Sequence, residues 1–240
     1  RVEEAIGCHL LDNRFEETFF AIYLQKAVAC VVAGNRITGV PGTEAATGNG
    51  VHAWGSSGVT IRDNVIPGPR DGIYREFARH TTVRDNTSER NLRYGLHFMF
   101  SDSSAYVGNT FARNGTGVAV MYSRVVTMDR NAFVGSRGPS AYGLLLKDVT
   151  DVQLTANRFE DNTAALVADG ATRLAARANR FERNAWAIRL LASTSDATFA
   201  ANGFTGNTFD VVVNSRTTGA TFRGNWWAAY RGWDLDRDGV

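Results

Sequence analysis

The fold class that the sequence predicts is all-β, a right-handed parallel β-helix with about 22–23 residues in each rung, or turn of the coil. Three observations predict it. An asparagine followed two residues later by a large apolar residue recurs along the chain, each interval holds three short strand-like runs separated by Gly, Asn, Asp and Ser, and a helical pair would need a longer interval. The right hand is expected because about 98% of crossovers between parallel strands are right-handed.

The recurring asparagines are expected at one corner of every rung. Asparagine tolerates a left-handed backbone, and its side chain can hydrogen-bond to the backbone of the neighbouring rung. The apolar residues two positions later should stack inside the coil, about 4.8 Å apart. Only Asn86 lacks such a residue, since Ser88 stands there. The ten asparagines are Asn13, Asn35, Asn64, Asn86, Asn109, Asn131, Asn157, Asn179, Asn202 and Asn225, and the aromatic column is Phe111, Phe133, Phe159, Phe181 and Phe204.

Two further strands are expected in each rung. The residues five and three positions before an asparagine are small or apolar with a polar residue between them, as Val59 and Ile61 are around Thr60. A second run starts with glycine fourteen residues before the next asparagine. Its inward column is Val51, Ile73, Leu96, Val118 and Leu144. The extra residues of the two long rungs, 39–49 and 136–140, should form loops that shape a binding surface.

Composition and chain ends limit what the protein can be. The 240 residues carry a net charge of +2 with both signs interspersed, which does not favour nucleic acid as a partner. No run of roughly eighteen apolar residues occurs in the sequence, so no membrane insertion is expected. We expect repeats in residues 1–225 and an aromatic C-terminal capping segment with a partial acidic loop in residues 226–240. Because the chain begins inside a repeat without a methionine or a signal-peptide pattern, we interpret it as a fragment whose N-terminal rungs or cap are missing.

The two cysteines occupy equivalent positions on adjacent rungs. Cys8 and Cys30 each lie five residues before an asparagine of the column, so they should be stacked about one strand spacing apart. Other rungs have small or apolar residues such as Val59 and Val126 there. We therefore interpret the cysteines as a pair of small buried residues, in preference to a disulfide or a thiolate metal site.

Soft metal-binding side chains gather on one outward face. His97 and Met99 should point outward from one strand, and the register puts Met121 of the next rung directly over Met99. Two thioethers beside an imidazole suit Cu(I) better than calcium or magnesium. These three residues are therefore a candidate site for transient copper.

Two alternatives remain for this face. It could be a protein-docking surface of ordinary surface side chains, to which we assign His52, Trp54, Tyr74 and Glu76. It could also belong to a β-helix enzyme, since enzymes that cleave or epimerise uronate polymers use clustered acids and a base on one outer sheet. Asp71 and Arg93 could contribute to such a cluster, but an aspartate at a turn normally serves the backbone, and Arg75 is expected to pair with its neighbour Glu76.

The end of the chain carries a separate candidate site. Asp234, Asp236 and Asp238 alternate before Gly239, which matches the first half of an EF-hand-like calcium loop. An acidic surface tail is the alternative. The aromatic residues before the loop should pack over the final rung: Trp226, Trp227, Tyr230 and Trp233.

Several phrases of the sequence together resemble the NosD family. The resemblance runs from about Gly7 to Gly239, and its repeat part is shared with many carbohydrate-binding and sugar-hydrolase β-helices. The phrases from His97 to Phe100 and from Val118 to Tyr122 are more specific. The full set comprises Gly50 to Trp54, Arg70 to Tyr74, Asn91 to Asp102, Gly117 to Ser123, Tyr142 to Asp148 and Asn225 to Trp227.

The resemblance implies a periplasmic, non-catalytic adaptor protein. NosD-like proteins work with a dedicated ABC transporter, whose ATPase and membrane subunits are NosF and NosY, and receive a copper-chaperone lipoprotein, NosL. They help to assemble the copper-sulfur centre of nitrous oxide reductase, NosZ. Ala228 and Ala229 stand where the family often has acidic residues, which weakens the calcium hypothesis. The competing classes are a lyase or C5-epimerase acting on alginate- or pectin-like uronates and a purely structural or adhesive β-helix.

Overall fold

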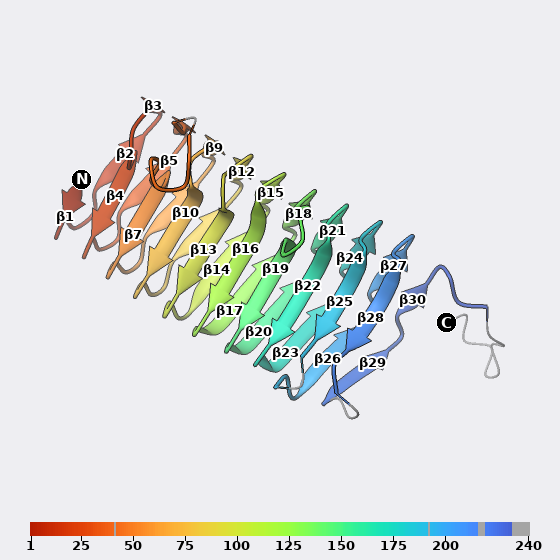
Figure 1. The fold of residues 1–240 in the computed structure, drawn as a ribbon. Coiled ribbons are helices and arrows are strands. Elements are labelled where there is room, and N and C mark those ends of the chain that lie inside the picture. The colour runs from red at the N-terminus through yellow and green to blue at the C-terminus, as the bar shows by residue number, and fades with distance from the viewer. Residues whose placement is uncertain (41, 192, 216–218, 232–240) are drawn as a thin grey trace.

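The computed structural model is a β-solenoid built from three parallel sheets of ten strands each, and Figure 1 shows the rungs stacked side by side along one axis. The structure describes all residues except 41, 192, 216–218 and 232–240. No helix occurs in this described part, and so none that is long and apolar enough to cross a membrane. The predicted parallel β-helix is confirmed.

Each rung contributes one strand to each sheet in turn. The first sheet contains β1 (Val2–Glu3), β4 (Ile22–Gln25), β7 (Val51–Trp54), β10 (Asp71–Glu76), β13 (Tyr94–Met99), β16 (Thr116–Met121), β19 (Tyr142–Lys147), β22 (Ala164–Asp169), β25 (Trp186–Leu190) and β28 (Phe209–Val213). The second sheet contains β2 (His9–Leu11), β5 (Val31–Ala33), β8 (Thr60–Arg62), β11 (Thr82–Arg84), β14 (Ser104–Val107), β17 (Arg124–Asp129), β20 (Thr150–Thr155), β23 (Thr172–Arg177), β26 (Ala197–Ala200) and β29 (Ala220–Arg223).

The third sheet follows the asparagine corner. It contains β3 (Arg14–Glu16), β6 (Arg36–Thr38), β9 (Val65–Pro67), β12 (Thr87–Glu89), β15 (Thr110–Ala112), β18 (Ala132–Val134), β21 (Arg158–Glu160), β24 (Arg180–Glu182), β27 (Gly203–Thr205) and β30 (Trp226–Trp227). The two predicted loops both lie between the third sheet and the next strand of the first sheet, one from β6 to β7 and the other from β18 to β19.

The expected phenylalanine column runs through the interior behind the third sheet. Phe111, Phe133, Phe159, Phe181 and Phe204 are at most 1% exposed. Successive rings are stacked with centroids 5.6, 4.7, 4.8 and 5.0 Å apart. Where the column is interrupted, the buried Ser88 hydroxyl donates to the Gly95 carbonyl at 2.8 Å and accepts from Asn91 at 2.8 Å, so the hydroxyl itself is paired.

The ten asparagines form the predicted ladder. The Asn64 Oδ1 atom accepts from both the backbone N–H and the side-chain amide of Asn35, at 3.0 and 2.9 Å, and this arrangement repeats from rung to rung. The expected left-handed backbone at asparagine was wrong. The left-handed residue is the one before it, as at Asp63 and Asp85, both with φ of 56°. The asparagine side chain instead satisfies backbone groups of the preceding rung, since Asn64 accepts from the Asn35 backbone N–H at 3.0 Å and donates to the Val32 carbonyl at 3.0 Å.

A second ladder was missed by the sequence analysis. Five residues after the first column, the backbone N–H of Asn91 donates to Asn114 at 3.0 Å, and that of Asn162 donates to Asn184 at 2.9 Å. Its members are Asn91, Asn114, Asn162, Asn184 and Asn207, with Ser136 in the remaining place. The signal was present as a repeated spacing of five residues between asparagines around the phenylalanine. The two ladders flank the strands of the third sheet from β12 to β27.

The interpretation of the cysteines as an unlinked pair was wrong. Cys8 and Cys30 form a disulfide between the first two rungs. Their Cα atoms are 4.5 Å apart, which lies within the range that a disulfide spans. The equivalent positions were predicted correctly; the in-register stacking of parallel rungs is what makes the bond geometrically feasible.

Arg75 does not pair with Glu76 as expected, because its side chain points into the coil and is completely buried. Its guanidinium donates to the Tyr106 hydroxyl and, at 3.1 Å, to Ser104 Oγ. It also lies 5.8 Å from the ring centroid of Phe98. Burial lowers the pKa of Arg75, and it raises the pKa of Tyr106 to about 12. The central rungs therefore enclose a cation whose partners are hydroxyls and aromatic rings.

Candidate functional site

The candidate residues lie on the outward face of the first sheet, over β7, β10, β13 and β16. Parallel pairing without a register shift stacks like positions of successive rungs. One outward column contains His52, Tyr74 and His97. The adjoining column contains Trp54, Glu76, Met99 and Met121. The predicted register is thus confirmed, and it brings every candidate of this face together.

Met99 and Met121 are direct partners on adjacent strands, and both side chains are half-buried. Adjacent strands are about 4.8 Å apart, and His97 shares the outward face of Met99 two residues earlier. No group of three or more His, Cys, Asp or Glu side chains that could hold a metal is found among the described residues. A copper contact on this face would therefore depend on the two thioethers and one imidazole.

His97 points outward as expected but is covered, with only 8% of its surface exposed. Its ring packs against those of Tyr74 and Tyr94, with centroids 5.2 and 4.6 Å away. The Asp71 Oδ2 atom lies 3.8 Å from His97 Nδ1, which is too long for a hydrogen bond. Both ring nitrogens therefore lack a hydrogen-bond partner in the structure. Buried polar atoms are rarely left unpaired, so this imidazole has an unused capacity to bind a ligand.

Asp71 beside His97 is engaged elsewhere. It is 0% exposed, and Arg93 donates to its two carboxylate oxygens from Nε at 2.9 Å and from Nη2 at 2.6 Å. Burial alone would raise the pKa of Asp71, but the hydrogen bonds and positive charge of Arg93 outweigh it and hold the pKa below its ordinary value. Asp71 is therefore an ionised, structurally paired carboxylate.

His52 and Tyr74 continue the aromatic column. Their ring centroids are 4.7 Å apart, and the Tyr74 hydroxyl donates to Glu76 Oε2 at 3.3 Å. Burial, with a smaller contribution from the charge of Arg70, lowers the pKa of His52 to about 4. His52 is therefore neutral at neutral pH. Burial also raises the pKa of Tyr74 to about 12, helped by the negative charge of Glu76.

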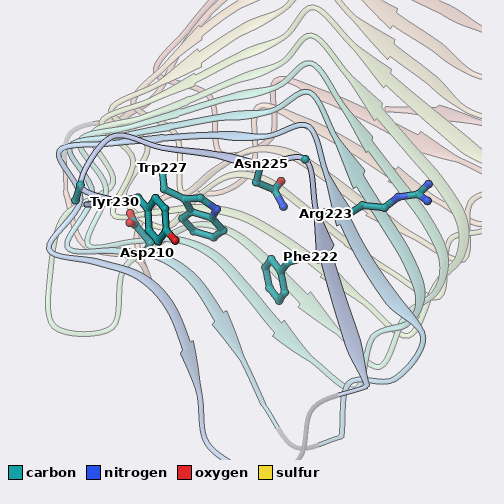
Figure 2. Close-up of a pocket in the computed structure, with 8 residues that line it drawn as sticks. Asp210, Phe222, Arg223, Asn225, Trp227 and Tyr230 are labelled. Atoms are coloured by element: carbon teal, nitrogen blue, oxygen red, sulfur yellow. The ribbon is translucent and has the colours of Figure 1, made fainter. Parts of the chain in front are cut away.

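A hollow of about 520 Å³ lies at the C-terminal end of the coil, and Figure 2 shows it with Trp227 and Phe222 lining it and Arg223 pointing away. Trp227 stacks on Phe204 at 4.1 Å, and Phe222 stacks on Phe199 at 4.8 Å. Within the described part of the chain, the hollow lies against the last rung of the solenoid interior, and we assign no ligand to it.

Of the described residues of the expected aromatic cap, one covers this end. Trp227 packs on the last rung, whereas Trp226 and Tyr230 are 56% and 62% exposed. The calcium candidates Asp234, Asp236 and Asp238, together with Trp233, lie outside the described residues.

Comparison with protein families and curated proteins gives a consistent result. The sequence profile described as "Periplasmic copper-binding protein (NosD)" matches residues 33–232. Two proteins named "Probable ABC transporter binding protein NosD" are similar, one from Stutzerimonas stutzeri with 30% identity over 95% of this chain and one from Pseudomonas aeruginosa with 33% identity over 98%. The alignments cover 56% and 58% of those proteins, so the chain spans somewhat more than half of their length.

Solved structures with the same fold include enzymes that act on alginate. A mutant of the periplasmic alginate epimerase AlgG matches with a TM-score of 0.68 and 12% identity, over 85% of this chain and 62% of that one. A Paenibacillus alginate lyase matches with a TM-score of 0.63 and 14% identity, over 90% of this chain and 96% of that one. At this identity the likeness demonstrates the fold alone.

Proposed function

Because this chain belongs to the NosD family of periplasmic copper-binding proteins, we propose that it is a periplasmic adaptor that helps to assemble the copper-sulfur centre of nitrous oxide reductase. The single observation that carries the proposal is the pairing of Met99 with Met121 beside a buried imidazole, His97, whose nitrogens are both unpaired. The names of the two relatives support an ABC transporter as a partner. The NosF and NosY subunits, the chaperone lipoprotein NosL and the reductase NosZ complete the proposed set of partners.

Copper is the cargo in this proposal. Thioether sulfur is a soft, uncharged ligand that suits Cu(I), and two thioethers with one imidazole leave the ion incompletely coordinated. Such a site binds copper for long enough to pass it on, whereas a closed cage would retain it. The carboxylate of Asp71 lies on the Nδ1 side of the His97 ring, 3.8 Å away, and favours the proton on that nitrogen. The lone pair of Nε2 then has no partner within the protein, and the rings that cover it must move aside for the metal to reach it.

Competition for Cu(I) with a chromogenic chelator tests the proposal. Met99→Leu/Met121→Leu keeps the apolar volume and removes both sulfurs, so the dissociation constant for Cu(I) should rise about tenfold or more. Met128→Leu is the matched control, because Met128 is completely buried in the interior and its sulfur is not on this face. Equal Cu(I) affinity in the double variant and the wild type, with equal reductase maturation, would refute the copper role.

We propose that the chain is not an enzyme, although the fold is shared with alginate-modifying enzymes. The carboxylate best placed for such chemistry, Asp71, is fully buried and bound by Arg93 through both oxygens, so it is not available to abstract a proton. Incubation with alginate and pectin should therefore yield neither unsaturated products nor a change in uronate stereochemistry. Turnover that is lost in Asp71→Asn would instead support the lyase or epimerase alternative.

A further inference from the structure

Three aromatic residues stack on the outside of the coil where the first sheet ends. Phe77, Phe100 and Tyr122, called here the corner ladder, directly follow the last residues of β10, β13 and β16. The ring of Phe100 lies 5.3 Å from that of Phe77 and 5.1 Å from that of Tyr122, and both pairs are within 12° of parallel. Trp54 packs edge-on against Phe77 at 6.4 Å and extends the apolar surface by one rung.

The backbone of the corner ladder is unfavourable for aromatic residues. Phe77, Phe100 and Tyr122 have φ values of 51°, 48° and 51°, in the left-handed region that bulky side chains rarely occupy. Other rungs place Lys26, Gly55, Asp148 and Gly170 at this corner. The fold therefore accepts glycine, a short polar residue or a flexible chain here, and the structural role of the corner does not require an aromatic ring.

The corner ladder is also exposed. Phe77, Phe100 and Tyr122 are 51%, 44% and 43% accessible, so their rings gain little from burial. Strained backbone combined with exposed apolar surface over three consecutive rungs indicates a binding surface, since neither feature stabilises the free protein.

The stacking geometry favours a protein partner over a glycan. Sugars bind to the faces of aromatic rings, but the faces of Phe100 are covered by Phe77 on one side and Tyr122 on the other. What the corner ladder presents to solvent is a ridge of ring edges, which carry the positive end of the ring quadrupole. A ridge of this shape fits an apolar groove lined by carbonyl or carboxylate oxygens.

The charges beside the ridge point to the same partner. On the flank facing the second sheet, Arg79 makes no ion pair with any described residue, and Arg124 is highly exposed, with its Nη2 atom 3.6 Å from Asp102 Oδ2. His80 is exposed next to Arg79. Arg124 lies near two carboxylates, those of Asp102 and Asp151, whereas Arg79 has no acidic partner among the described residues, so Arg79 gives this flank a positive charge complementary to an acidic rim.

We propose that the corner ladder is the docking ridge for the protein that exchanges Cu(I) with Met99 and Met121, a folded copper carrier with an apolar groove and an acidic rim. This rests on the proposed function. Met99 and Met121 immediately precede Phe100 and Tyr122 in the chain, so a carrier seated on the ridge has its metal beside the two thioethers. Docking and metal transfer then use adjacent but separable surfaces.

The test uses the soluble domain of the copper-chaperone lipoprotein, loaded with Cu(I), as the probe. Phe77→Gly/Phe100→Gly/Tyr122→Gly should weaken its binding about tenfold or more and slow copper transfer, while leaving the intrinsic Cu(I) affinity unchanged. Glycine already occupies this corner at Gly55 and Gly170, so the variant should fold as the wild type does. The matched control is Ala178→Gly/Ala201→Gly, which relieves left-handed backbone at another corner and should bind the probe normally.

Two further variants distinguish a failure of the docking ridge from a failure of the proposed copper function. Met99→Leu/Met121→Leu should lose Cu(I) affinity and still bind the probe, whereas Arg79→Glu/Arg124→Glu should weaken probe binding at low salt and retain Cu(I) affinity. Unchanged probe binding by the glycine variant would overturn the docking ridge and leave the copper site untouched. Binding of an alginate oligosaccharide that disappears in the glycine variant would also overturn it, in favour of a glycan.

Discussion

Two corners of the same coil differ in what occupies them. The corner before the third sheet has asparagine in all ten rungs, and from Asn35 to Asn225 each side chain accepts from the backbone N–H of the asparagine one rung earlier. The corner after the first sheet varies from lysine to glycine to aspartate and holds aromatic residues in three adjacent rungs. A uniform column therefore identifies a structural requirement of the fold, whereas a local run of unfavourable residues in a variable column identifies a binding surface.

The largest expected effect concerns the uniform interior next to the asparagine corner. Phe159→Ala removes a completely buried ring stacked between Phe133 and Phe181 and should reduce the free energy of unfolding by about 3–5 kcal/mol. Phe209→Ala, at a ring that is 51% exposed, should cost much less. Chemical denaturation measures both, and equal losses would break the distinction between interior and surface columns.

Arg75 is a buried charged residue in a largely apolar interior, and its replacement should have the next largest effect on stability. Arg75→Met/Tyr106→Phe removes the enclosed charge together with the hydroxyl that receives its hydrogen bond. Replacing a buried ionic group with apolar residues of similar volume is often stabilising by about 1–4 kcal/mol, so the melting temperature should rise. Arg75→Met alone leaves the Tyr106 hydroxyl without its donor and should gain less. A large loss of stability in the double variant would mean that the cation is needed to specify the packing of the central rungs.

The asparagine corner itself should respond to deletion of one amide. Asn131 accepts two hydrogen bonds from Asn109 and donates to Asn157 and to the Tyr106 carbonyl. Asn131→Ala removes the acceptor of the buried Asn109 backbone N–H and a donor to the Tyr106 carbonyl, and should cost about 1–3 kcal/mol. Asn13→Ala, in the first rung and exposed to solvent, should cost less when both are measured by thermal unfolding.

The smallest expected effect is a pH dependence of the unfolding free energy that arises from His52 on the outward face of the first sheet. The folded-state pKa of His52 is about 4 against 6.5 as its ordinary value, so the unfolded chain binds the proton more strongly. Stability should therefore be complete above pH 6.5 and fall as the pH drops from 6.5 towards 4. His52 is partly exposed, so solvent screening reduces the expected loss to about 1 kcal/mol. His52→Gln should flatten the slope of unfolding free energy against pH in that window, and an unchanged slope would assign it to other groups.

The sequence by itself determined the coil, the asparagine and phenylalanine columns and the register that puts Met99 against Met121. The reason is that equivalent positions of successive rungs are direct neighbours in a parallel solenoid. The repeat period of the sequence therefore specifies which residues are in contact between rungs. The second asparagine ladder follows the same rule and was readable in the spacing of Asn109 and Asn114, or of Asn157 and Asn162.

Only the tertiary structure decided the features that depend on distance, rotamer or backbone angle. The disulfide between Cys8 and Cys30 requires a particular approach of two backbones. The inward course of Arg75 depends on the hydroxyls of Ser104 and Tyr106, which belong to another sheet. His97 is covered by Tyr74 of the preceding rung and by Tyr94 of its own strand, which depends on the side-chain rotamers. The strain in the corner ladder is visible only in the backbone φ angles. The rotamer of a long side chain and the backbone angle of a corner each depend on several neighbouring residues at once. The repeat period of the sequence does not contain this information.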